Sequence, residues 1–150
     1  ELKLSADPTR TYVVPLPKDP VPYLNFSPLQ NAFTILQERT KECDRAMQNM
    51  DIQKLSRSTQ ENLNAMFMRM EQHLTEKQGL PRRPWFVHQL YAPGAYTGYG
   101  VKTLPAVREA IELRNWNEAE EQISTVSKVL LRYAEEIGRI TSLIKPSGKN

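Results

Sequence analysis

The sequence predicts an all-α protein: an antiparallel helical bundle with a long Gly/Pro/aromatic loop and an extended Pro-rich N-terminal arm. Residues 29–78 contain neither proline nor glycine, the two residues least compatible with a helix interior. Residues 119–144 carry apolar side chains at alternating spacings of four and three, the repeat of one helix face. Six of the eleven prolines lie in residues 1–28, where they disfavour a regular helix. We therefore divide the chain into an arm, 1–28, and a helical domain, 29–150.

The composition excludes several classes of protein. The chain has 150 residues, which fits a single domain. Its one cysteine cannot form an internal disulfide, so the fold must depend on a packed core. The sequence has no run of 18 or more apolar residues of the kind that spans a bilayer. Its 20 basic and 17 acidic residues give a formal net charge of only +3. We therefore expect no nucleic-acid partner and no direct membrane contact.

The arm is predicted to be extended. Each proline removes a backbone N–H donor and pushes the preceding residue toward extended geometry. The arm holds too many apolar side chains for a solvated linker, so we expect it to lie over the rest of the domain; these side chains are Tyr12, Val13, Val14, Leu16, Val21, Tyr23, Leu24 and Phe26. An alternative interpretation is a polyproline II ligand for a separate partner.

Residues 29–78 are predicted to form helix with a break in the middle. An apolar stripe in the first half comprises Phe33, Leu36, Thr40, Cys43, Met47 and Met50, with Thr40 its one polar member. Ser27 is a suitable N-cap with Pro28 at the first helical position. Asp51 can begin a new segment after the break, and Ser58 with Glu61 has the spacing of a capping box for the second helix. A second stripe comprises Leu63, Met66, Phe67, Met70 and Leu74. Gly79 suits a left-handed C-cap.

The last block is the clearest periodic signal. Its stripe comprises Ala119, Ile123, Val126, Leu130, Tyr133, Ile137, Ile140 and Ile144. With Asn117 as the N-cap and Pro146 as the stop, it predicts a helix of about 27 residues, or about 40 Å. A shorter helix, opened by Pro105, precedes it. The stripe fits either the core of a helical bundle or the seam of a dimer.

Between the helical blocks lies a segment, residues 79–103, without any acidic residue. It contains Arg82, Arg83, His88 and Lys102, together with Trp85, Phe86, Tyr91, Tyr96 and Tyr99. A connection this long in a compact domain is commonly functional. Cations and tyrosine hydroxyls on a Gly-rich loop are suited to an anion such as a carboxylate. The alternative is a structural loop whose aromatic side chains plug one end of the bundle.

The sequence offers little for catalysis. His73 and His88 are the two histidines, and no motif for a zinc, nucleophile or phosphate site is present. We predict no catalytic residue, no metal ligand and no cofactor in this chain. Cys43 is interpreted as a small core side chain, and Glu135 and Glu136 as solvated charges on a helix face.

One segment resembles a known family. Residues 79–93 read Gly-Leu-Pro-Arg-Arg-Pro-Trp-Phe-Val-His-Gln-Leu-Tyr-Ala-Pro, and Tyr99-Gly100 and the helix-opening Leu104-Pro105 follow. This pattern resembles the C-terminal helical domain of the transferrin receptor and glutamate carboxypeptidase II (prostate-specific membrane antigen) family. The resemblance covers about residues 26–144. It implies a transferrin receptor-like dimerisation domain, folded as an antiparallel helical bundle, with homodimerisation as its role.

The resemblance also implies a larger parent protein. In the family the domain follows a protease-associated domain and a peptidase domain with two zinc ions, on a type II membrane or vacuolar/secretory-pathway protein. The chain alone is then not an enzyme, and its parent is either a zinc-dependent carboxypeptidase-like peptidase or an inactive receptor. The first helix of the domain is missing or represented only by Glu1 to Leu4.

A substrate contact is implied as well. In the carboxypeptidase members, the loop after Tyr-Ala-Pro folds over the substrate pocket, and a Lys-Tyr pair holds the carboxylate of a C-terminal glutamate. Tyr99 stands at the tyrosine position, whereas Gly98 stands in place of the lysine. This difference puts a preference for glutamate in doubt.

Two interpretations of the function compete. In the first, the chain is a homodimerisation module, with Ile123, Leu130 and Ile137 of the last stripe as interface residues and with the parent's upstream domains as further partners. In the second, the chain is a helical adaptor that binds an acidic partner or nucleic acid through Arg82, Arg83 and Lys102.

Overall fold

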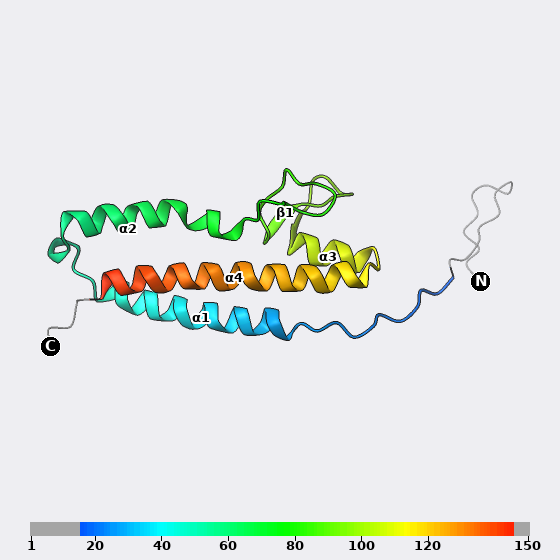
Figure 1. Ribbon diagram of the computed structural model, residues 1–150, viewed down its shortest axis with the longest axis horizontal. Coiled ribbons are helices and arrows are strands. Elements are labelled where there is room, and N and C mark those ends of the chain that lie inside the picture. Colours follow the sequence, from blue (N-terminus) through cyan, green and yellow to red (C-terminus); the bar gives the residue numbers. More distant parts are fainter. Residues whose placement is uncertain (1–15, 146–150) are drawn as a thin grey trace, which may run out of the picture.

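The computed structural model describes residues 16–145, and this part of the chain is mostly helical (Figure 1). The α-helices are α1 (Ser27–Gln48), α2 (Arg57–Arg69), α3 (Pro105–Glu112) and α4 (Trp116–Ile144). Two short 3-10 helices, η1 (Ile52–Lys54) and η2 (Met70–Leu74), flank α2. The strands β1 (Tyr91–Pro93) and β2 (Val101–Thr103) pair antiparallel, with Tyr91 opposite Thr103. The prediction of a predominantly helical bundle is confirmed, and the small sheet is an addition to it.

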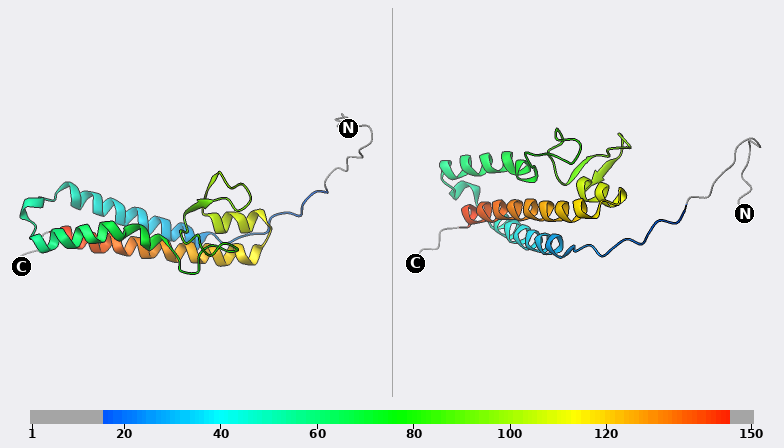
Figure 2. Two further views of the ribbon diagram at one scale, coloured as in Figure 1. Left: turned by 90° about the horizontal axis from the view of Figure 1, so that it is seen from above. Right: turned by 45° about the vertical axis from the view of Figure 1, so that its right-hand side comes forward.

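The helices form two layers (Figures 1 and 2). Helices α1 and α4 lie side by side in one layer, and α2, the long loop and α3 lie over α4 in the other. Helices α1 and α4 run in the same direction, because Ala32 packs with Ala119 at one end and Cys43 packs near Ile140 at the other. The fully antiparallel order is therefore wrong for this pair. Helix α2 returns the chain to the starting end, so that α4 can run parallel to α1.

Helix α4 packs against α1, α2 and α3. Every member of its predicted stripe is buried except Tyr133, which is half-buried, so the prediction of a continuous apolar face is confirmed. The N-cap lies two residues earlier than predicted: Asn115, not Asn117, accepts a hydrogen bond from the Glu118 N–H at 3.4 Å. Glu118 then lies in the first turn, where the helix dipole favours a carboxylate.

Helix α1 buries a face that is shifted from the predicted one. Ala32 and Cys43 are buried, whereas Phe33 and Met47 are exposed. Small side chains such as Ala32 occupy the line of contact because they let the two helix backbones approach closely. Phe33, the bulkier side chain that follows Ala32, therefore lies at the edge of the contact between the two helices. Pro28 lies in the first turn as expected, although α1 begins at Ser27 and Phe26 is its N-cap.

The break after α1 is confirmed, but one cap is different. Asp51 accepts a hydrogen bond from the Gln53 N–H and opens η1. Helix α2 is capped by Ser56, whose hydroxyl accepts from the Thr59 N–H at 3.1 Å, rather than by Ser58. Leu63 is buried against α4, whereas Phe67 of the predicted stripe is exposed.

The described part of the arm, residues 16–26, has no regular secondary structure. Leu24 is buried in the core between α1 and α4, and the Arg114 guanidinium donates to the backbone oxygens of Asp19 and Pro20. Phe26 is half-buried and packs against the same core, whereas Leu16, Val21 and Tyr23 are exposed, so the expectation holds for only two of these five side chains. Residues 1–15, with Tyr12–Val14 and the segment Glu1 to Leu4, lie outside the described residues.

Gly79 allows a tight turn in the long loop. Its φ of +68° is left-handed, as predicted, but the turn lies beyond the end of η2 and is not a helix cap. A Cβ at this position would lie 2.2 Å from the Pro84 carbonyl oxygen.

Replacing Gly79 with alanine should therefore destabilise the protein for two reasons. The left-handed backbone alone costs an alanine about 1–2 kcal/mol, and the clash with the Pro84 backbone adds to that. Gly98 is the matched control, because its φ is +66° but no atom lies within 4 Å of an added Cβ. Urea unfolding should show a larger loss for Gly79→Ala than for Gly98→Ala. Equal losses would show that the Pro84 contact is unimportant.

Candidate functional site

The hairpin formed by β1 and β2 projects from the end of the bundle where α3 lies (Figure 1). Its tip, residues 94–100, is held together by backbone hydrogen bonds from the Gly94 N–H to the Gly100 oxygen and from the Gly98 N–H to the Gly94 oxygen. Tyr99 at this tip is fully exposed, and Tyr96 is largely exposed. The tip contains no charged residue. It therefore presents tyrosine hydroxyls, but no cation, to whatever it contacts.

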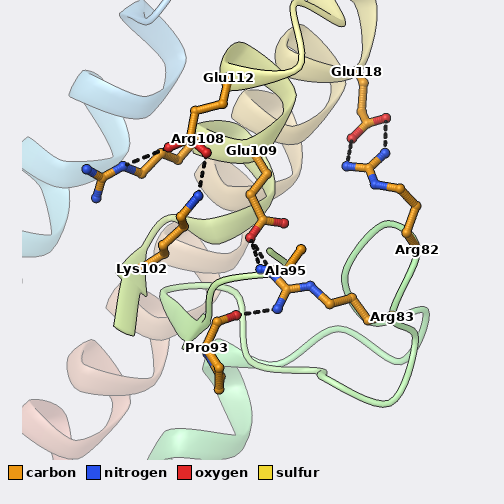
Figure 3. Close-up of polar contacts among 9 residues, drawn as sticks. All are labelled: Arg82, Arg83, Pro93, Ala95, Lys102, Arg108, Glu109, Glu112 and Glu118. Atoms are coloured by element: carbon orange, nitrogen blue, oxygen red, sulfur yellow. Dashed lines mark hydrogen bonds and ion pairs between the residues drawn. The ribbon is translucent and has the colours of Figure 1, made fainter. Parts of the chain in front are cut away.

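The three loop cations are each paired with a carboxylate of the chain (Figure 3). Arg82 makes a bidentate contact with Glu118, with both N–O distances 2.8 Å. Arg83 lies 2.6 Å from Glu109, and Lys102 pairs with Glu112. All three carboxylates lie on α3 or at the start of α4. The cations thus hold the loop on the helices, and the chain's own carboxylates offset their charge.

The pair between Arg82 and Glu118 has an electrostatic consequence. The hydrogen bonds from the Arg82 guanidinium lower the pKa of the Glu118 carboxyl, and burial opposes them only in part. Asn115 also donates to this carboxylate, at 2.9 Å. Glu118 is therefore ionised throughout the neutral range, and the loop stays attached to the start of α4 there.

Both histidines have structural contacts. The Nδ1 atom of His88 lies 3.3 Å from the backbone N–H groups of Leu90 and Tyr91, and burial lowers the pKa of its imidazole. The Tyr91 hydroxyl donates to Glu71, which raises the pKa of Tyr91. His73 lies 3.9 Å from Glu136, which is buried and also pairs with Arg139. The prediction that Glu136 is a solvated charge is therefore wrong, whereas Glu135 is exposed.

The described residues offer no arrangement for a metal. Within residues 16–145, no group of three or more His, Cys, Asp or Glu side chains could hold a metal ion. Cys43 is buried in the core and unpaired with another cysteine. In the same range, no helix is both long and apolar enough to cross a membrane.

The residues predicted for a dimer interface lie inside the protomer. Ile123 and Leu130 pack against the start of α1, and Ile137 packs against Cys43 and Leu63. Because all three are buried by the chain's own helices, a partner cannot reach them in this structure. The bundle-core interpretation of the stripe therefore accounts for these side chains.

A different face of the α1–α4 layer is uncovered. A groove of about 550 Å³ runs between the two helices, and no residue of α2 or α3 lines it. We call it the free face; its lining residues are Ile35, Arg39, Leu131, Ala134, Glu135, Gly138, Arg139 and Ser142. Ile35 and Leu131 expose apolar surface in it, and charges of both signs lie beside them. Sequence reasoning missed this face because its apolar residues form no continuous stripe.

The chain is similar in sequence to a known domain family and to two known proteins. The family model of the transferrin receptor-like dimerisation domain matches residues 24–138. Over 75 residues the chain is 36% identical to a probable glutamate carboxypeptidase of Arabidopsis thaliana. This match covers 45% of the chain and 11% of that protein. Over 69 residues it is 35% identical to a probable glutamate carboxypeptidase of Arthroderma benhamiae, and this match covers 46% of the chain and 10% of that protein. The chain thus spans about a tenth of the length of these curated relatives.

Proposed function

The chain belongs to the family of transferrin receptor-like dimerisation domains, and we propose that it joins two copies of a glutamate carboxypeptidase-like parent protein into a homodimer. The similarity to two probable glutamate carboxypeptidases supports this choice of parent. The two zinc ions of such a parent would be held by an upstream peptidase domain, since the described residues form no metal site. In this proposal the dimerisation domain supplies no catalytic residue of its own.

The observation that carries the proposal is the free face of the α1–α4 layer. Two parallel helices form a flat layer, and two such layers packed face to face make a four-helix arrangement. Gly138 is small enough to let a second helix approach closely, while Ile35 and Leu131 supply exposed apolar area. Arg39, Glu135 and Arg139 place both signs of charge on the face, so a two-fold axis can bring unlike charges together. The mass of the chain in solution tests this proposal directly.

The hairpin tip supports a second part of the proposal. We propose that it lies over the parent's substrate pocket, with the Tyr99 hydroxyl donating to a substrate carboxylate. An exposed tyrosine on a glycine-bearing tip is free to meet a ligand from another domain. Because Gly98 carries no side chain and Lys102 is paired with Glu112, the tip contributes a hydroxyl but no charge. The parent's selectivity for a C-terminal glutamate would then be weak.

Replacing Tyr99 with phenylalanine in the full-length parent should raise KM for a peptide with a free C-terminal carboxylate. Loss of a hydrogen bond to a charged group costs about 1.5–3 kcal/mol, or roughly a tenfold to hundredfold rise. The kcat should change little, because the bound carboxylate takes no part in bond cleavage and the hydrogen bond therefore stabilises ground state and transition state alike. Tyr96→Phe is the matched control on the same tip. An unchanged KM for Tyr99→Phe would remove the substrate-contact role.

A further inference from the structure

A buried ion pair lies where three segments of the chain meet. Arg83 from the long loop is 5% exposed, and Glu109 from α3 is 2% exposed. The Arg83 Nη2 donates to the Glu109 Oε1 at 2.6 Å, and the Arg83 Nη1 donates to the backbone oxygen of Pro93. The same Glu109 oxygen accepts from the Ala95 N–H at 2.9 Å. Figure 3 shows the two side chains converging on the start of the hairpin tip.

This pair differs from its neighbours in burial. The Arg82 side chain, paired with Glu118, is 41% exposed, and exposed pairs add little to stability. A buried pair pays a large desolvation cost, and well-packed apolar side chains of similar volume would often serve stability as well or better. The pair instead fixes an orientation, because Arg83 Nη1, Arg83 Nη2 and Glu109 Oε1 meet their partners together in this geometry, although the buried Arg83 Nε has no partner among the described residues.

The contacts fall at the base of the hairpin. Pro93 ends β1 and Ala95 is the second residue of the tip, so the pair holds the chain on both sides of Gly94. Lys102 on β2 pairs with Glu112, which lies one turn further along α3. Both strands are therefore attached to the same helix. Apart from the Ala95 N–H, which donates to Glu109, the backbone hydrogen bonds of the tip are internal, so the position of Tyr99 follows from the position of the base.

We propose that Arg83 and Glu109 are positioning residues that fix the hairpin base on α3 and thereby set where Tyr99 meets the substrate. The inference rests on the role proposed above for the hairpin. Neither residue touches substrate. Removing either partner frees the Pro93–Ala95 segment, so that the tip samples several positions and binds the substrate less tightly.

Amide hydrogen exchange in the 150-residue chain tests the anchoring by itself. Arg83→Gln should speed exchange at the Ala95 amide by at least about tenfold, since that hydrogen bond opens locally without global unfolding. Arg82→Gln, the adjacent arginine with an exposed pair, is the matched control and should leave the rate within about twofold. Equal rates for the two variants would overturn the proposal. Should Arg83→Gln not fold, Glu109→Gln, which retains an acceptor for the Ala95 N–H, takes its place.

Kinetics of the full-length parent test the consequence. Glu109→Gln should raise KM for a free-carboxylate peptide by roughly fivefold or more with kcat nearly unchanged, whereas a merely structural defect would lower the active fraction and leave KM alone. Tyr99→Phe is measured beside it. If Tyr99→Phe raises KM and Glu109→Gln does not, the positioning role is overturned while the hairpin's role stands. If Tyr99→Phe has no effect, the role of the hairpin itself fails, and the exchange comparison alone decides whether Arg83 anchors it.

Discussion

Replacing Ile140 with alanine should lower the free energy of unfolding by about 2–5 kcal/mol, the usual cost of this truncation in a packed core. Ile140 is 1% exposed and packs with Cys43, Leu63 and Ile137 where α1, α2 and α4 meet. Truncation leaves a cavity that helices held together by many other contacts cannot fully close. Urea unfolding at one fixed protein concentration gives the measurement, because self-association also contributes to stability.

Ile52 is the matched control for this prediction. It is 59% exposed on η1, so Ile52→Ala should cost no more than about 0.5 kcal/mol. A loss for Ile140→Ala as small as that of the control would mean that the α1–α4 contact is not the principal core.

Replacing Leu131 with arginine should dissociate the homodimer, with the dissociation constant rising by about a hundredfold or more. Leu131 is the first α4 residue that lines the free face and exposes 36% of its surface. In a two-fold interface the substitution replaces an apolar contact on each copy with a charge pressed against the partner, where an unpaired charge is costly. The monomer should stay folded, because the side chain already reaches solvent. Sedimentation velocity measures the change.

Leu113 supplies the control for Leu131. It is 44% exposed and caps the C-terminal end of α3, in the other layer of the molecule. Leu113→Arg adds the same charge and removes a similar apolar area, yet should leave the dimer intact. If both variants dissociate to the same extent, the added charge and not the free face is responsible.

The local sequence pattern predicted the helices well, but it did not predict which face of α1 is buried or how the helices pack together. The stripe of α4 follows from the helical repeat alone, so Ala119 through Ile144 could be assigned to one face. The buried face of α1 depends on how closely α4 approaches, which is a tertiary property. Ala32 therefore replaced Phe33 in the core. The parallel direction of α1 and α4 leaves no mark in the sequence, because both directions bury the same stripes.

In the candidate site, too, local features could be predicted from the sequence and long-range contacts could not. The exposed position of Tyr99 fits a glycine-bearing tip, a local feature that the sequence displays. The partners of Arg82 and Arg83 lie 36 and 26 residues away in the chain, so these arginines looked like free cations. The stripe that suggested a dimer seam turned out to be the core. The free face contains too few apolar residues at regular spacing to be recognised before the layer is assembled.

The mass of the unmodified chain in solution tests the central claim most directly. Sedimentation equilibrium at about 50 μM, above the dissociation constant expected for a stable protein–protein interface, is the measurement. Homodimerisation predicts a species of twice the chain mass of 17.3 kDa, shifting toward the single mass on dilution. A single species of 17.3 kDa across the whole concentration range would contradict it.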